Sequence, residues 1–248
     1  MRNKKLLNKF IIGGSRANGA SVSGYEFYNI LSPHSPRDVI ESYRKLYANV
    51  MFLPIEDKCR KIVVASANKG EGKTTVSVNL AVTLAQNLND SKVLLIDCNL
   101  RNPGVELMLS KDFQRRGLAE FLSGRDKEPN IVASSVNGLS VLYAGDLPEN
   151  PTRLISSERM AELFRICEER FDYIILDTTA LEVGSEAMLL KKHVSGYILV
   201  AKARNSDVGA LSSAIESLQT LKAKVFGVVL TGEEMKRKKA RRFLLRRK

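Results

Sequence analysis

Ser66-Ala-Asn-Lys-Gly-Glu-Gly-Lys-Thr-Thr75 is the stretch of sequence that decides the fold. Its glycines, Gly70 and Gly72, allow the backbone to turn its N–H groups inward around an anion. Lys73 is then placed to reach the β- and γ-phosphates of a nucleotide, and the Thr74 hydroxyl is placed to ligate Mg²⁺. The stretch therefore predicts a phosphate-binding loop for ATP and Mg²⁺.

The segments on either side of this loop support the same interpretation. Lys61–Ala65 is a short apolar run with β-branched residues, and Thr75–Ala85 carries apolar residues at helical spacing. A strand, a loop and a helix in this order aim the helix N-terminus at an anion. The first loop position is Ala67 instead of the usual glycine, and the flanking segments compensate for that departure. The residues expected to bind the nucleotide are Asn68, Lys69, Gly70, Glu71, Gly72, Lys73, Thr74 and Thr75.

Strand-like and helical patterns alternate along the rest of the chain, which at 248 residues is long enough for one well-packed domain. This alternation predicts an α/β fold of the P-loop NTPase type, with a mostly parallel sheet and helices on both faces. The predicted strands are Lys61–Ala65, Lys92–Asp97, Leu139–Ala144, Tyr173–Asp177, Gly196–Ala201 and Val225–Leu230. The predicted helices include one that Ser35-Pro36 begins and that ends near Phe52, followed by Glu158–Arg170, Gly184–His193 and Asp207–Ala223.

Two of the predicted strands end in a carboxylate, Asp97 and Asp177. Each acid could cap the helix that follows it. However, ligands of open α/β sheets gather at the carboxyl ends of strands, and an acid there is costly unless a cation or hydrogen-bond donors meet it. With the phosphate loop upstream, we expect both acids to handle Mg²⁺ and water. The predicted catalytic residues are Lys73, Asp97 and Asp177, and the predicted Mg²⁺ ligands are Thr74, Asp97 and Asp177.

The net charge of +12 is concentrated at the two ends of the chain. Nine Lys and Arg residues lie in Lys236–Lys248 and four in Met1–Phe10, so the remainder is nearly neutral. We therefore divide the chain into a basic N-terminal segment and flexible linker (1–30), an ATP-binding domain (31–232) and a polybasic tail (233–248). Apolar runs are too short for a transmembrane helix or a signal peptide. The three cysteines lack metal or redox spacing, which favours a reducing cytoplasm.

The phosphate loop, Ile96–Arg101 and Ile175–Thr178 together resemble the Walker A, A′ and B motifs of the bacterial tyrosine kinases of capsule and exopolysaccharide export, the CpsD/CapB type. The resemblance covers about Leu31 to Gly232. It implies tyrosine autophosphorylation with ATP and Mg²⁺ between subunits of a ring. It also implies a transmembrane adaptor of the polysaccharide co-polymerase type and a cytoplasmic location at the inner face of the cell membrane. Further segments with counterparts in that family are Ser32–Pro36, Glu41–Arg44, Gly117–Gly124, Asn150–Met160 and Gly227–Leu230.

The chain departs from the family pattern at several positions. Asn99 stands where the A′ motif of the family has its second acid. Asparagine cannot accept a proton or bring negative charge to Mg²⁺, so we expect weaker turnover. Thr179-Ala180 replaces the two prolines that usually follow the Walker B motif. Tyr47 replaces the second arginine of the Glu-x-x-Arg-x-x-Arg helix motif. The last tyrosine is Tyr197, so the family's C-terminal tyrosine cluster is missing and an acceptor must lie elsewhere. The expected acceptors are Tyr25, Tyr28 and Tyr47, which lie in or beside the N-terminal segment.

Two alternatives to an active kinase remain open. One is a catalytically weakened, ATP-binding regulator of polysaccharide export. The other is a partition- or division-type ATPase switch bound to membrane or DNA, although the signature lysine of that class would stand at Asn68 and Lys69 is one place off. The tail Lys236–Lys248 suits an anionic membrane surface or an acidic adaptor segment. Nucleic acid is the weaker partner, because Phe243 is the tail's one aromatic residue available for base stacking.

Overall fold

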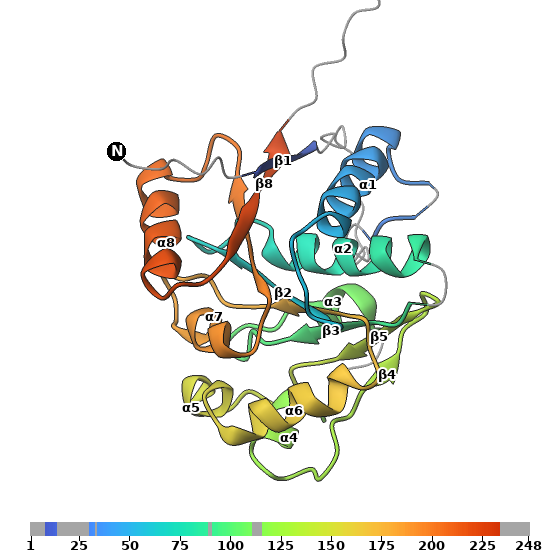
Figure 1. The fold of residues 1–248 in the computed structure, drawn as a ribbon, viewed down its shortest axis with the longest axis vertical. Helices are drawn as coiled ribbons and strands as arrows, with labels where there is room; N and C mark the ends of the chain where they lie inside the picture. Colours follow the sequence, from blue (N-terminus) through green and yellow to red (C-terminus); the bar gives the residue numbers. More distant parts are fainter. Residues whose placement is uncertain (1–7, 14–29, 33, 89–90, 111–115, 234–248) are drawn as a thin grey trace, which may run out of the picture.

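The computed structural model describes residues 8–13, 30–32, 34–88, 91–110 and 116–233, and the statements on structure below refer to them. The described chain is built around one eight-stranded sheet in the order β1-β8-β7-β2-β6-β3-β5-β4 (Figure 1). Neighbouring strands pair in parallel except β4 and β5, which are antiparallel. The strands are β1 (Asn8–Gly13), β2 (Arg60–Ser66), β3 (Val93–Asp97), β4 (Val132–Ala133), β5 (Leu139–Leu142), β6 (Tyr173–Asp177), β7 (Gly196–Lys202) and β8 (Val225–Glu233).

Helices cover the sheet on both sides (Figure 1). One layer contains α1 (Arg37–Met51), α2 (Lys73–Asn87) and α3 (Val105–Leu109). The other contains α4 (Leu118–Leu122), α5 (Pro151–Ile155), α6 (Glu158–Glu168), α7 (Glu186–Leu189) with the 3₁₀ turn Leu190–Lys192, and α8 (Val208–Thr220). Among the described residues, no helix is long and apolar enough to cross a membrane.

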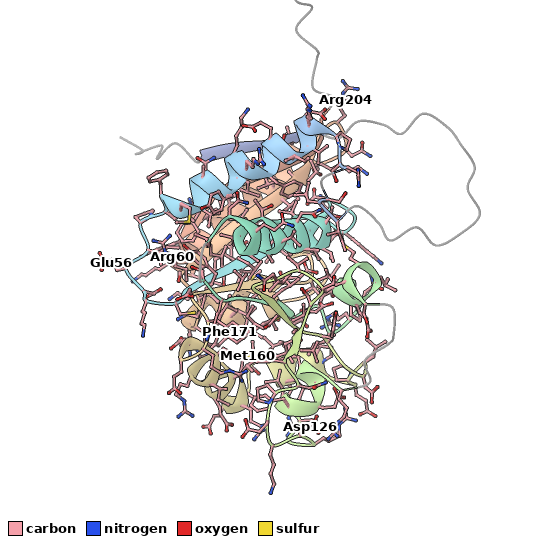
Figure 2. All side chains as sticks on the ribbon, turned by 90° about the vertical axis from the view of Figure 1, so that its right-hand side faces the viewer. Glu56, Arg60, Asp126, Met160, Phe171 and Arg204 are labelled. Carbon is pink, nitrogen blue, oxygen red and sulfur yellow. The ribbon has the colours of Figure 1, made fainter. Side chains whose placement is uncertain are left out.

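Alternation of side chains along the central strands separates two hydrophobic cores. In β2, Ile62 and Val64 belong to the core under α1 and α2, whereas Val63 and Ala65 belong to the core on the opposite face. Met160 of α6, labelled in Figure 2, is fully buried in that second core. A strand buried on both faces reads as a continuous apolar run, which is why the parallel sheet was recognisable from sequence.

The α/β architecture with a mostly parallel sheet and helices on both faces is confirmed, and all six predicted strands are present. Two strands were not predicted: the short β4, and β1, which lies within the segment assigned as N-terminal arm and linker and pairs in parallel with β8. Helix α1 begins at Arg37 with Pro36 as its N-cap. The predicted cap, Ser35, instead accepts a hydrogen bond from the Ser32 amide through its hydroxyl.

The predicted helix Gly184–His193 is shorter in the structure, where α7 spans four residues and continues as the 3₁₀ turn. Several predictions fall outside the described residues: the acceptor tyrosines Tyr25 and Tyr28, most of the predicted linker, and the polybasic tail Lys236–Lys248 with Phe243. The proposed domain boundaries therefore stay predictions.

Candidate active site

The phosphate loop connects β2 to α2 at the carboxyl edge of the sheet, as its sequence predicts. Gly70 and Gly72 have φ of 80° and 93°, in the left-handed region that favours glycine. Gly72 is the N-cap of α2 and Lys73 is the first helical residue. The unpaired N–H groups and the positive end of the helix dipole therefore face the end of the loop where an anion can bind.

The Glu71 side chain holds the loop in shape. It is buried, and its Oε2 accepts a hydrogen bond from the Asn68 amide at 3.0 Å while its Oε1 accepts one from the Ser206 hydroxyl. Its backbone carbonyl accepts a bond from Thr231 Oγ1 at 2.8 Å. Neither Asn68 nor Glu71 is among the described residues that line the cavity beside the loop. The two residues instead stabilise the shape of the loop, through the hydrogen bond between the Asn68 amide and the Glu71 carboxylate.

Asp177, at the end of β6, is fully buried and meets the first turn of α2. The Thr74 hydroxyl donates to its Oδ2 at 2.7 Å, and the Ser77 hydroxyl donates to its Oδ1 at 2.9 Å. Burial raises the pKa of Asp177 to about 6, against the opposing effect of these hydroxyls and of Lys73. Burial likewise lowers the pKa of Lys73, and the nearby Asp177 works in the opposite direction.

Asp97, at the end of the neighbouring strand β3, stands in register with Asp177 and is also fully buried. Its Oδ1 accepts from the amide of Asn99 at 3.0 Å, and its Oδ2 accepts from those of Gly104 and Val105 at 3.1 and 3.0 Å. Burial, and next the charge of Asp177, raise the pKa of Asp97 to about 7. Asp97 thus anchors both ends of the loop 98–104.

This pair of acids fits a divalent cation. Ionising two carboxyls that are fully buried and close together costs free energy, as their raised pKa values show. A cation beside them would offset that cost. Among the described residues, there is no group of three or more His, Cys, Asp or Glu side chains that could hold a metal ion. A site with only two carboxylates suits Mg²⁺, because this ion keeps several waters and takes further oxygens from the substrate's phosphates.

Asn99 has a structural role that its sequence position alone does not reveal. Its side-chain nitrogen donates to the Asn102 carbonyl at 2.6 Å, and its side-chain oxygen accepts from the Asn102 amide at 3.3 Å. A carboxylate offers no hydrogen to that carbonyl, so an aspartate could make only one of these two bonds. The residue that replaces the expected acid therefore closes the turn of loop 98–104.

A cavity of about 620 Å³ opens beside the phosphate loop. Its lining by described residues includes three cationic side chains, Lys69, Lys73 and Arg101, and no acidic one. Two of its apolar lining residues are unusually exposed, Leu107 at 62% and Val183 at 45%. The other lining residues are Gly70, Gly72, Thr74, Thr75, Asn99, Asn102, Pro103, Gly104, Thr179 and Ala180.

Arg101 is held in this lining by a fully buried glutamate, Glu186 of α7. Arg101 donates to Glu186 Oε1 through Nε at 3.0 Å and through Nη2 at 2.7 Å. The Thr152 hydroxyl donates to the same oxygen at 2.8 Å and accepts from Arg101 Nη2 at 3.2 Å. The Thr179 hydroxyl donates to Glu186 Oε2 at 3.1 Å. Thr179, one of the departures from the family pattern, is thus part of a network that sequence reasoning missed.

Packing and charge both fix this glutamate. A Cβ on Gly184 would lie 2.0 Å from Glu186 Oε2, so the carboxylate needs a glycine there. Burial alone would raise the pKa of Glu186, but the hydrogen bonds from Arg101 and Thr152 hold it below its ordinary value. No short-range sequence signal marks Glu186, because its arginine lies 85 residues away along the chain.

Helix α1 contacts the phosphate-loop helix through Tyr43, whose buried hydroxyl donates to the Thr75 carbonyl at 3.4 Å. Burial raises the pKa of Tyr43 to about 12, so the hydroxyl stays protonated. The three positions of the Glu-x-x-Arg-x-x-Arg helix motif differ in exposure. Glu41 and Arg44 are exposed, whereas Tyr47 is half-buried against the core under α1. An acceptor role for Tyr47 stays a prediction.

The chain is similar to known proteins along most of its length. Residues 59–224 match the family model of the AAA domain. The tyrosine-protein kinase YwqD of Bacillus subtilis is 31% identical over 208 residues, which is 84% of this chain and 87% of that protein. The tyrosine-protein kinase etk of Escherichia coli is 29% identical over 204 residues, which is 82% of this chain but 28% of that longer protein.

Solved structures agree with these sequence similarities. The kinase domain of the Escherichia coli tyrosine kinase ETK superposes with a TM-score of 0.81 at 26% identity, and the match covers 94% of this chain and 93% of that domain. The septum site-determining protein MinD of Pyrococcus horikoshii, solved with Mg-ADP, has a TM-score of 0.59 at 25% identity over 69% of this chain and 70% of that one.

Proposed function

Since the chain belongs to the family of bacterial tyrosine kinases, we propose that it is an ATP- and Mg²⁺-dependent protein-tyrosine kinase that transfers the γ-phosphoryl group of ATP to a tyrosine hydroxyl. The observation that carries the proposal is the meeting of the phosphate loop with two fully buried acids, joined by the bond between Thr74 and Asp177. Phosphoryl transfer needs little covalent chemistry from the protein and depends on positioning and charge stabilisation.

Each predicted catalytic residue and Mg²⁺ ligand has a role in this proposal. Lys73 and the N–H groups of the loop hold the phosphates, with the end of α2 behind them. Thr74, Asp97 and Asp177 are the residues that would hold Mg²⁺, directly or through its waters, and the ion would supply charge neutralisation at the phosphates. Asp97 also fixes loop 98–104 by its backbone hydrogen bonds, so the same carboxylate shapes the wall of the cavity.

We further propose that the kinase works in capsule or exopolysaccharide export, at the inner face of the cell membrane. The kinase region is a small part of the longer etk, whereas this chain spans most of YwqD. As its partner we propose a transmembrane adaptor of the polysaccharide co-polymerase type. A homo-oligomer would bring one subunit's acceptor to another subunit's site.

A second candidate is an ATP-binding regulator with little turnover. Asn99 favours it, because this residue lacks the acid of the family pattern and its amide is committed to the Asn102 backbone. In this case nucleotide binding would persist and the state of loop 98–104 would be the output.

The test is incubation of the purified protein with ATP and Mg²⁺, with and without the adaptor's cytoplasmic segment, followed by mapping of phosphotyrosine by mass spectrometry. The kinase proposal expects phosphotyrosine in the wild-type protein and none in the Asp177→Asn variant. Nucleotide binding without phosphotyrosine under either condition would reject the kinase and support the regulator.

The polybasic tail has its own test. We expect deletion of Lys236–Lys248 to abolish co-sedimentation with anionic vesicles or with the adaptor segment while ATP affinity stays unchanged. The wild-type interaction should weaken with salt, because the Debye length falls from about 10 Å at 0.1 M to about 3 Å at 1 M. A truncated protein that still co-sediments at physiological salt would exclude a binding role for the tail.

A further inference from the structure

We propose that the side of the cavity formed by Arg101, Leu107 and Val183 binds an acidic, tyrosine-containing segment of the acceptor polypeptide, with Glu186 as the positioning residue for Arg101. This inference deepens the proposed kinase function and rests on it for the identity of the ligand as an acceptor. The supporting observations are the charge of the cavity lining, the remaining hydrogen-bonding capacity of Arg101 and the exposed apolar residues beside it.

The described lining contains a cation outside the phosphate loop. Lys69 and Lys73 belong to that loop, whereas Arg101 is a further cation, and none of the described lining residues is acidic. The exposed acid Glu182, next to Val183 in the chain, accepts a hydrogen bond from the Lys69 amide at 2.6 Å. Arg101 lies in loop 98–104, whose far end packs close to the Thr74 side chain: a Cβ on Gly104 would lie 3.1 Å from Thr74 Cγ2. Arg101 and Thr74 therefore line the same cavity from two different elements.

The geometry of Arg101 leaves one edge of its guanidinium available. Nε and Nη2 are turned to Glu186 and Thr152, which fixes the plane of the group. Within the described residues, Nη1 makes no hydrogen bond, and the side chain is 38% exposed. A guanidinium that is fixed on one side and has free N–H groups on the other is suited to an incoming carboxylate.

The exposed apolar residues of the lining supply the second part of the ligand's chemistry. Leu107 and Val183 come from α3 and from the loop after β6, and both line the same cavity as Arg101. Large apolar side chains this exposed in a cavity commonly contact an apolar group of a ligand. An aromatic ring flanked by a carboxylate satisfies both features, which selects an acidic segment around a tyrosine.

The test is equilibrium binding of a fluorescent acidic tyrosine peptide to the full chain, saturated with a non-hydrolysable ATP analogue and Mg²⁺. We expect Arg101→Ala to raise the peptide Kd about tenfold or more, Arg101→Lys to raise it less, and Glu186→Gln to raise it by an amount between them. The matched control is Arg125→Ala, because Arg125 also pairs with a buried glutamate but lies outside the cavity lining. We expect this control to change the Kd less than about twofold.

A second pair of variants tests the apolar part. Leu107→Ala should weaken the peptide about threefold or more, while Leu147→Ala, which trims an equally exposed leucine outside the cavity lining, should not. In turnover assays, Glu186→Gln should raise the KM for the acidic peptide with little change in the KM for ATP, which a merely structural role would not produce.

The inference is wrong if Arg101→Ala leaves peptide affinity unchanged, or if Arg125→Ala weakens the peptide equally. It is also wrong if Arg101→Ala weakens the ATP analogue instead of the peptide, since Arg101 would then be a nucleotide ligand. The binding assay involves no transfer, so it separates the two proposals. Arg101-dependent peptide binding without phosphotyrosine would support this site and reject the kinase, and phosphotyrosine with no effect of Arg101 would do the reverse.

Discussion

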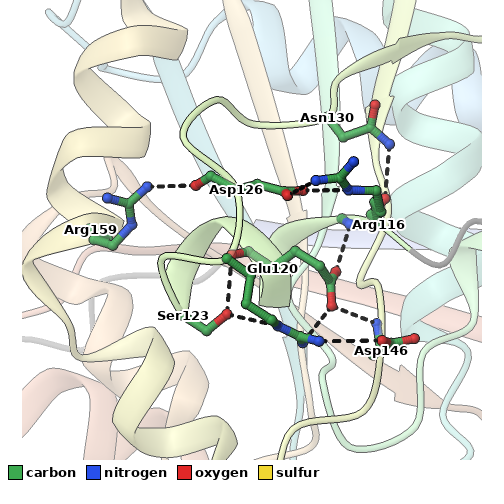
Figure 3. Close-up of polar contacts among 9 residues, drawn as sticks. Arg116, Glu120, Ser123, Asp126, Asn130, Asp146 and Arg159 are labelled. Carbon is green, nitrogen blue, oxygen red and sulfur yellow. Dashed lines mark hydrogen bonds and ion pairs between the residues drawn. The ribbon is translucent and has the colours of Figure 1, made fainter.

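Two buried glutamates among the described residues each bind an arginine, and the two arginines differ in how many of their nitrogens the protein uses. Glu186 binds Arg101 at 2.7 Å beside the cavity. Glu120 of α4, whose surroundings are drawn in Figure 3, binds Arg125 at the same distance outside the cavity lining. Each carboxylate leaves no room for a Cβ on a nearby glycine, which is Gly184 in the first case and Gly145 in the second. The framework of the two pairs is therefore alike.

The difference lies in what the arginine does with its other donors. Arg125 uses all three of its nitrogens within the protein, because Nε donates to Ser123, Nη2 to Glu120 and Nη1 to Asp146 (Figure 3). Arg101 keeps Nη1 free of hydrogen bonds to described residues and lines a cavity. The comparison teaches that a buried acid can either stabilise a local structure or hold an arginine toward a cavity. The two roles are distinguished by whether one edge of the guanidinium is left without hydrogen bonds to the described residues.

The largest expected effect concerns the buried acids that have no arginine. Asp97 and Asp177 have pKa values raised to about 7 and about 6 by burial, above about 3.9 for an unfolded aspartate. A raised carboxyl pKa makes ionisation oppose folding, so the free energy of unfolding without nucleotide should fall as pH rises from about 4 to about 7. We expect a fall of roughly 4 kcal/mol between pH 5 and 8, from about two pKa units for Asp97 and one for Asp177 at about 1.4 kcal/mol per unit.

Urea unfolding at the two pH values measures this effect, and the control is the double variant Asp97→Asn, Asp177→Asn. Its stability should depend less on pH than that of the wild type, whatever its absolute stability. Because Glu186 has an arginine partner and a lowered pKa, the Glu186→Gln variant should keep the wild-type slope over this range. Equal slopes in the wild type and the double variant would contradict the assignment of the two aspartates.

A smaller effect is expected when each glutamate loses its charge. Glu186→Gln and Glu120→Gln keep the size of the side chain but weaken its bonds to the arginine and place an NH₂ group where donors point. Hydrogen bonds to charged groups contribute about 1.5–3 kcal/mol, so with partly exposed arginines we expect each variant to lose roughly 2 kcal/mol in urea unfolding. Glu186→Gln should lose more, because Glu186 accepts from Arg101 twice and from Thr152 and Thr179.

Both variants are needed for the comparison. If Glu120→Gln were neutral while Glu186→Gln destabilised the protein, the two pairs would not share a framework role. If both destabilised it equally and both weakened acceptor binding, the distinction based on the unused edge of Arg101 would fail.

The smallest stability effect is expected at Asn99. Asn99→Asp removes the donor to the Asn102 carbonyl and places a carboxylate oxygen beside it, which should cost about 1 kcal/mol in urea unfolding. The same change adds a carboxylate near the predicted Mg²⁺ site, so phosphotyrosine yield should rise if turnover is limited by the missing acid. The control is Asn102→Ala, which keeps the backbone partner and should change yield less. A stable Asn99→Asp protein with no gain in phosphotyrosine would contradict this account of the departure.

The sequence predicted those parts of the molecule whose signals are local. The phosphate loop carries its glycines, Lys73 and Thr74 within ten residues, and an apolar strand ending in an acid is enough to place Asp97 and Asp177 at one edge of a parallel sheet. The parallel sheet itself followed from alternating strand and helix patterns.

The parts that were missed depend on residues distant in sequence or on the exact course of a loop. Glu186 meets Thr152 across 34 residues and Arg101 across 85, and no periodicity records such contacts. Strand β1 is recognisable only through its parallel partner β8 near the other end of the chain. The role of Asn99 depends on the turn that brings Asn102 back to it. The sequence shows that an acid is missing at this position, but it does not show the hydrogen bond that the asparagine makes instead.

The most direct test of the central claim, that this cavity is an ATP·Mg²⁺ site built on the phosphate loop, is calorimetric titration of the wild type and of Lys73→Met with ATP and Mg²⁺. Methionine keeps most of the side-chain volume and removes the cation. The account predicts that the variant binds at least about tenfold more weakly, which is about 1.4 kcal/mol, and that the wild type loses affinity when Mg²⁺ is omitted. Equal affinity in the two proteins would contradict it.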